Sequence, residues 1–77
     1  MKKKRIECYK KNNPYSVTIA KVYPSKIVIE STSLEWLSYG FTTRKIIERK
    51  KNPKEYEEML RELRTFTLSW TPVECYE

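Results

Sequence analysis

The chain has 77 residues, of which 39% are hydrophobic and 34% are charged, and its formal net charge is +6. A chain of this length supports one hydrophobic core, so we expect a single domain over residues 1–77. The longest runs without a charge span nine positions, 12–20 and 65–73. They exclude a membrane-spanning helix, which needs roughly 20 apolar residues, and no apolar run near the N-terminus forms the core of a signal peptide.

The residue types that are missing exclude several classes of enzyme. The sequence contains no His and no Asp, and Gly40 is its one glycine. Catalytic triads of the Ser–His–Asp and Cys–His types need His, phosphate-binding loops need several glycines, and zinc sites need more ligands than two cysteines supply. Glu55, Glu58 and Glu62 share a helical face beside Lys and Arg, which is typical of a solvated surface. We therefore predict a protein that is not an enzyme and has neither a metal site nor a cofactor.

The N-terminal part is predicted to form three antiparallel strands. Residues 5–10 alternate between two faces, as a strand requires. Asn and Pro at 12–14 indicate a turn, and 15–23 is rich in β-branched and aromatic residues. Pro24 then suits the first central position of a two-residue turn, and the return strand begins at 27–29.

The next two segments are ambiguous. Thr32–Glu35 matches a capping box, and Gly40 would end a short helix in the left-handed conformation, whereas a strand through 36–41 is the competing interpretation. Residues 43–51 contain adjacent isoleucines, which suit a short helix or a strand buried on both faces. We prefer a helix for both segments. Two short helices joined by a tight turn would give a loose helix-turn-helix arrangement with a basic second helix.

The C-terminal part carries the strongest signal, an amphipathic helix over about 53–65. Asn52 is a good cap and Pro53 suits the first helical position. An apolar stripe follows at positions i, i+3, i+4 and i+7, formed by Tyr56, Met59, Leu60 and Leu63. Residues 65–71 alternate with a period of two, which predicts a half-buried strand, and Pro72 indicates the edge or the end of a sheet. The sequence thus predicts an α+β fold, an antiparallel sheet of three to five strands with the helix packed on one face.

Cys8 and Cys75 fall in the first and last strand-like segments, outside any CxxC motif. One interpretation is two separate buried thiols in a reducing cytosol. The other is a disulfide that closes a loop of nearly the whole chain, for which the ideal loop-entropy stabilisation is about 4–5 kcal/mol. The absence of Gln and the abundance of Lys, Glu, Tyr and Ile resemble the composition of hyperthermophile proteins, in which intracellular disulfides occur. The sequence leaves both interpretations open.

Positive charge is concentrated in two segments. Residues 1–11 carry six Lys or Arg side chains against Glu7, and residues 44–54 carry six against Glu48. Clustered cations are the electrostatic signature of a phosphate-binding surface. The favoured hypothesis is a small basic protein that binds DNA or RNA, mainly through sequence-neutral backbone contacts, once the two segments converge. The residues expected to contact phosphates are Lys2, Lys3, Lys4, Arg5, Lys10, Lys11, Arg44, Lys45, Arg49, Lys50 and Lys51. Tyr9 and Tyr15 are the candidates for stacking on bases.

The second hypothesis is a protein-interaction factor without a nucleic-acid substrate, such as a viral accessory protein, an inhibitor of a host protein or a homo-oligomeric structural protein. The aromatic residues Trp36, Tyr39 and Phe41, together with Trp70, would form an adhesive surface or a homodimer interface. The basic segments would then face an acidic protein surface. Under either hypothesis we expect a cytoplasmic protein that does not bind membranes.

Overall fold

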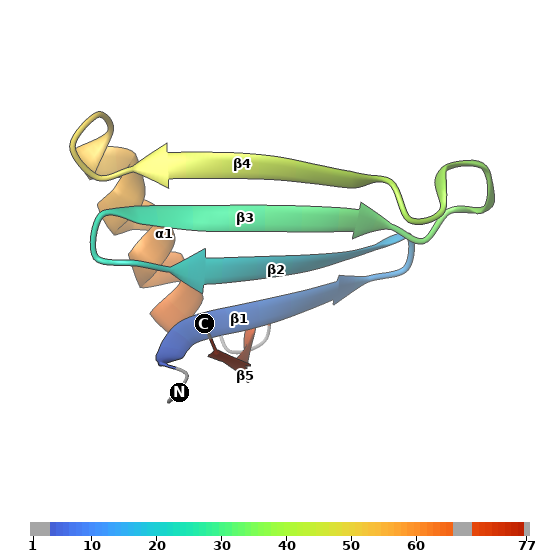
Figure 1. Ribbon diagram of the computed structural model, residues 1–77, viewed down its shortest axis with the longest axis horizontal. Helices are drawn as coiled ribbons and strands as arrows, with labels where there is room; N and C mark the ends of the chain where they lie inside the picture. The colour runs from blue at the N-terminus through green and yellow to red at the C-terminus, as the bar shows by residue number, and fades with distance from the viewer. Residues whose placement is uncertain (1–3, 66–68, 77) are drawn as a thin grey trace.

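The computed structural model describes residues 4–65 and 69–76, which form five strands, one 3-10 turn and one α-helix. In chain order the elements are β1 (Arg5–Asn13), β2 (Ser16–Val22), β3 (Lys26–Ser33), the 3-10 turn η1 (Trp36–Ser38), β4 (Thr42–Glu48), α1 (Pro53–Thr65) and β5 (Thr71–Tyr76). The strands make one antiparallel sheet in the order β4-β3-β2-β1-β5 (Figure 1). The predicted α+β fold is confirmed.

The first four strands form a meander, of which the sequence predicted the first three strands and the turns at Pro14 and Pro24. The first turn lies slightly later than predicted, because Asn12 and Asn13 still belong to β1. Pro14 and Tyr15 make the two-residue turn between β1 and β2. Between β2 and β3, the Tyr23 amide donates to the Lys26 carbonyl at 2.8 Å and the Lys26 amide donates back at 3.4 Å. Pro24 is therefore at the first central position of this turn, where its fixed φ is already suitable.

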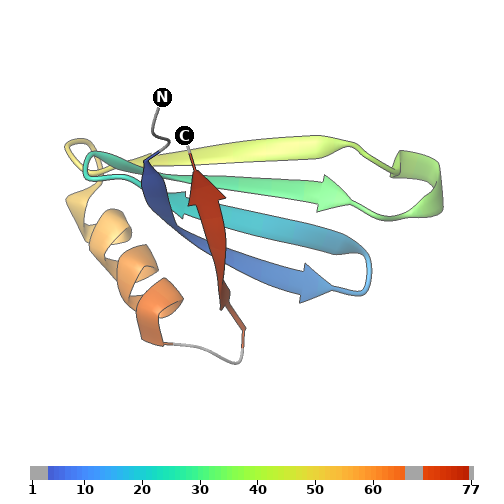
Figure 2. The ribbon, with the colours of Figure 1, turned by 60° about the horizontal axis from the view of Figure 1, so that its bottom comes forward.

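The helix covers one face of the sheet at the end where the β2–β3 turn lies, and the other end of the sheet extends beyond it (Figure 2). α1 begins at Pro53 as predicted, and the Tyr56 amide donates to the Asn52 carbonyl at 3.0 Å. A core cluster joins this face of the sheet to the helix and to the start of β5, and consists of Ala20, Ile27, Ile47, Tyr56, Leu63 and Trp70.

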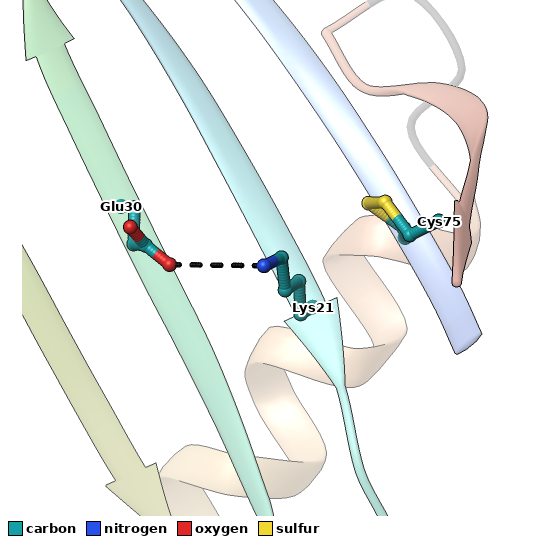
Figure 3. The surroundings of a disulfide bond; sticks show 4 residues. Lys21, Glu30 and Cys75 are labelled. Atoms are coloured by element: carbon teal, nitrogen blue, oxygen red, sulfur yellow. Dashed lines mark ion pairs between the residues drawn. A yellow bond between two sulfur atoms is a disulfide. The ribbon is translucent and has the colours of Figure 1, made fainter. Parts of the chain in front are cut away.

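The strand register assigns every second residue to the opposite face, which we call the open face because α1 does not pack on it. Facing residues in neighbouring strands identify its members, which include Cys8, Lys10, Lys21, Val28, Glu30, Arg44 and Ile46. Cys8 and Cys75 lie on this face and form a disulfide, which joins β1 to β5 near the two ends of the chain (Figure 3). The sequence left open a disulfide or two separate thiols, and the structure contains the disulfide.

Two helix predictions differ from the structure. Residues 43–51 do not form a helix, because 42–48 pair with β3 as strand β4, and the helix-turn-helix arrangement is therefore wrong. The adjacent isoleucines face opposite sides of the sheet, Ile47 toward the core and Ile46 toward the open face. Residues 42–48 form a strand because the edge of β3 supplies backbone hydrogen-bond partners. A prediction from local propensity does not include such distant partners.

The expected helix over 33–41 is reduced to the 3-10 turn Trp36–Ser38. Gly40 does adopt the left-handed conformation, with φ +84°, and it directs the chain into β4. The strand predicted over 65–71 is displaced, since Thr65 ends α1, 66–68 lie outside the described residues and β5 begins at Thr71. Pro72 lies in β5, an edge strand, as its missing amide donor predicted.

Candidate interaction surfaces

The most unusual surface lies at the end of the sheet farthest from α1, where two connections lie side by side (Figure 1). The Leu34 amide donates to the Tyr15 carbonyl at 2.8 Å and so ties the loop between β3 and β4 to the turn between β1 and β2. We call this end the aromatic tip. Its large apolar side chains are Tyr15, Leu34, Trp36, Leu37, Tyr39 and Phe41. All except Leu34 are 67–88% exposed.

The loop that carries the aromatic tip is closed by its own polar groups. Ser33 is its centre, because the Ser33 amide donates to the Phe41 carbonyl at 2.9 Å and its carbonyl accepts from the Gly40 amide at 2.9 Å. The Ser33 hydroxyl also lies 2.7 Å from the Ser38 hydroxyl and accepts from the Glu35 amide at 3.2 Å. These bonds close the loop on its own polar groups, while its aromatic side chains are exposed.

This arrangement reverses the usual pattern of a surface loop, in which polar groups face water and apolar groups turn inward. Trp36 and Leu37 are each 88% exposed. Between the two connections lies an open hollow of about 540 Å³, lined by Pro14, Tyr15, Leu34 and neighbouring residues of the loop. An exposed apolar patch of this kind marks a binding surface more often than a random surface feature.

Sequence reasoning identified the stretch 36–41 but missed Leu34 as part of the same surface. The available signal was charge, because Glu35 is the single charged residue between Ser31 and Thr43. Trp70, which the second hypothesis added to this surface, is instead buried in the core cluster. Tyr15 was assigned to base stacking beside Lys10 and Lys11. The structure instead places it at the aromatic tip, where the two turns meet.

The two basic segments lie on different strands. Lys4, Arg5, Lys10 and Lys11 belong to β1 or precede it directly, whereas Arg44 and Lys45 belong to β4, and Arg49, Lys50 and Lys51 follow β4. Strands β2 and β3 separate the two groups. Lys2 and Lys3 are outside the described residues. The segments therefore do not merge along their whole length into one cationic platform.

Glutamates accompany several of these cations. Arg44 lies 3.6 Å from Glu30, which also contacts Lys21 at 3.9 Å on the open face (Figure 3). Further ion pairs join Lys45 to Glu55 and Lys51 to Glu48, each at 3.1 Å. Exposed pairs of this kind are worth about 1 kcal/mol or less and can rearrange when a ligand binds. They nevertheless lower the local positive potential along β4.

A smaller group of cations gathers at the end of the sheet opposite the aromatic tip, and we call it the basic end. It consists of Arg5, Lys26, Arg49 and Lys50, beside the turn between β2 and β3. Arg49 donates to the Pro24 carbonyl at 3.4 Å and its guanidinium lies 5.7 Å from the centre of the Tyr56 ring. Within the described part of the chain, no ion pair is recorded for these four side chains.

Tyr9, the other stacking candidate, points toward the helix side and is half-buried against the core cluster. Its hydroxyl donates to the Glu7 carboxylate at 2.6 Å. Burial, followed by this hydrogen bond, raises the pKa of Tyr9. Glu7 also accepts two hydrogen bonds from Arg64, at 2.9 Å to Nε and 2.8 Å to Nη2, and the guanidinium holds the pKa of Glu7 below its usual value.

Among the residues that the structure describes, no group of three or more His, Cys, Asp or Glu side chains is arranged to hold a metal ion. No helix in the described ranges is both long enough and apolar enough to cross a membrane. No protein family, curated protein or solved structure matches this chain.

Proposed function

We propose that this protein is an interaction module that docks on another protein through its aromatic tip. The observation that carries the proposal is the exposure of Trp36 and Leu37, each 88% accessible on a loop fixed by its own hydrogen bonds. Aromatic residues of this kind supply most of the binding energy in protein interfaces. A cytoplasmic location stays part of the proposal.

Rigid presentation supports a binding role. A mobile loop would lose backbone entropy when it docks, at about 1–2 kcal/mol for each residue that becomes fixed. Here the Ser33 and Ser38 hydroxyls are paired and the backbone amides of residues 33–35, 38, 40 and 41 already donate hydrogen bonds, so much of the backbone entropy is lost during folding. Glu35 is the single charged residue of the loop 34–41. We therefore expect the partner to offer an apolar site, with a cation or an amide near Glu35.

The first experiment identifies what the tip touches. A photo-crosslinking amino acid is placed at Leu37 on the tip and, in a matched protein, at Glu57, an exposed residue of α1. We expect one protein in the native host extract to crosslink from position 37 and not from position 57. Equal crosslinking from both positions, or none from position 37, would contradict the proposal.

The second experiment measures affinity for the purified partner. Trp36→Ala should weaken binding by about 2 kcal/mol or more, as expected for a central aromatic contact. Tyr76→Ala, which removes a half-exposed ring outside the tip, should leave binding unchanged. Isothermal titration calorimetry measures the affinity of both variants for the partner. If the tip binds phospholipid vesicles instead of a protein, flotation of the wild type but not of Trp36→Ala will reveal it and the protein assignment fails.

Nucleic-acid binding is retained as a second candidate because of the basic end. Arg5, Lys26 and Lys50 have no recorded carboxylate partner among the described residues, and Arg49 contacts a carbonyl and a ring. Binding through phosphates would fall steeply with salt because counterions are released. A gel-shift titration should then show equal weakening for all sequences after Arg49→Glu and Lys50→Glu, with Trp36→Ala as the neutral control. Absence of any shift at low salt removes this candidate.

A further inference from the structure

Strand β4 forms one border of the sheet, and none of the described strands pairs with its outer edge (Figure 1). At one end of this edge the Asn52 amide donates to the Glu48 carbonyl. The hydrogen bonds at its two ends define which backbone groups point outward. The Arg49 amide donates to the Ser25 carbonyl and the Phe41 carbonyl accepts from the Ser33 amide, both at 2.9 Å. In an antiparallel ladder such pairs alternate with pairs that are not hydrogen-bonded. The odd-numbered residues of β4 therefore bond to β3, and Arg44, Ile46 and Glu48 direct their amides and carbonyls away from the sheet.

The two edge strands of the sheet differ in how strongly they discourage pairing with an additional strand. The β5 edge contains Pro72, which lacks an amide donor and discourages the addition of another strand. The β4 edge contains no proline, and its Ile46 side chain is 49% exposed. An open edge that carries an exposed β-branched residue is a template for another strand.

We propose that two copies of this chain associate through β4, antiparallel and with the two-fold axis at Ile46. The two Ile46 residues then form a hydrogen-bonded pair at the axis. On each side of it the Glu48 amide of one copy donates to the Arg44 carbonyl of the other. The Glu48 carbonyl already accepts from the Asn52 amide at 2.8 Å, so the core of the interface is a ladder of about four backbone hydrogen bonds.

The charged residues of β4 favour this register over registers with the two-fold axis at a neighbouring residue. An axis at Arg44, Lys45 or Glu48 sets that charged residue opposite its own copy. An axis at Ile47 sets cations of β4 opposite cations of the following turn. An axis at Ile46 instead sets Arg44 opposite Glu48 twice, and directly opposed unlike charges stabilise a strand pair whereas like charges destabilise it.

The ion pairs already present on the open face fit the same register. Arg44 contacts Glu30 at 3.6 Å and Glu48 contacts Lys51 at 3.1 Å in the single chain. Association would link these pairs into a row of alternating charge, Glu30, Arg44, then Glu48 and Lys51 of the second copy. The guanidinium of Arg44 has five N–H donors and can serve both carboxylates. The Ile46 side chains would cover each other between the two rows.

The symmetry also has a consequence for the aromatic tips. Because the two β4 strands run in opposite directions, the tips lie at opposite ends of a continuous ten-stranded sheet. The dimer is therefore bivalent, whatever the tip binds. The β4 dimer leaves both aromatic tips uncovered, whereas a dimer formed through Trp36 and Leu37 would bury them.

Charge exchange tests the register. Wild type should sediment as a dimer with twice the 9.3 kDa mass of the chain. Arg44→Glu alone sets Glu opposite Glu48, and Glu48→Arg alone sets Arg opposite Arg44, so each variant should be monomeric. An equimolar mixture restores two unlike pairs and should form a heterodimer in native mass spectrometry. A wild type that stays monomeric at its highest soluble concentration, or a mixture that stays monomeric, would overturn the proposal.

Crosslinking provides a test that does not depend on the charged variants folding. Ile46→Cys brings two thiols to the axis with Cα atoms about 5.5 Å apart, within the range of a disulfide. Thr42→Cys, on the same strand and face, keeps the thiols roughly 26 Å apart. Mild oxidation should give a covalent dimer on a non-reducing gel for Ile46→Cys only. Equal crosslinking of both variants, or loss of the wild-type dimer after Leu37→Ser, would show another interface.

Discussion

At the scale of single residues, the Glu7 carboxylate accepts three hydrogen bonds. It accepts hydrogen bonds from Arg64 in the last turn of α1 and from Tyr9 on its own strand. The bond from Arg64 lowers the pKa of Glu7, so ionised Glu7 stabilises the folded state. This contribution is complete above the unfolded pKa of Glu, about 4.3, and is lost as the pH falls through the lowered folded pKa.

Glu7→Gln should therefore destabilise the protein by about 1 kcal/mol at pH 7, the scale of an exposed bidentate pair. The difference from wild type should shrink toward zero as the pH falls below about 4, where the carboxylate of wild type becomes protonated. Urea denaturation across this pH range measures both effects. Glu57→Gln, on the exposed side of α1, serves as the control. A difference that does not change with pH would contradict this role of Glu7.

At the scale of elements, the attachment of β5 depends on a covalent bond as well as on pairing. The Cys8–Cys75 disulfide joins β1 to β5 across a sequence separation of 67 residues. The double substitution Cys8→Ala and Cys75→Ala should lower the free energy of unfolding by about 2–4 kcal/mol, because the unfolded chain regains the entropy of an open loop. Denaturant titration checks this, and reductant should destabilise wild type but not the double variant. If reductant leaves wild type unchanged, the bond contributes nothing to stability.

At the scale of the whole molecule, the core cluster and the aromatic tip lie at different ends of the sheet. The core cluster lies under α1, whereas the aromatic tip lies beyond the helix and contains no buried side chain. Replacing 34–40 by Asn–Gly would close β3 and β4 with a two-residue hairpin turn. We expect the unfolding free energy to change by about 1 kcal/mol or less and binding of the partner to be lost. A global loss of the circular dichroism signal would show that the tip is needed for folding.

Two groups of elements follow from local signals in the sequence. The meander from Arg5 to Ser33 was predicted because Pro14 and Pro24 mark turns between strands with suitable side chains. The helix Pro53–Thr65 was predicted because its cap and its apolar stripe agree with each other. Such signals act between neighbours in the chain and need no distant partner.

The remaining features required the tertiary structure. Residues 42–48 become a strand because β3 offers an edge, and Cys8 meets Cys75 because α1 returns the chain to the far side of β1. Arg44 faces Glu30, and Tyr15 meets Leu34, only through the strand register. The sequence by itself determined which elements are stable locally and how the charge is distributed. The fold decided which side chains meet, since contacts between distant segments depend on strand order and register, which no local pattern encodes.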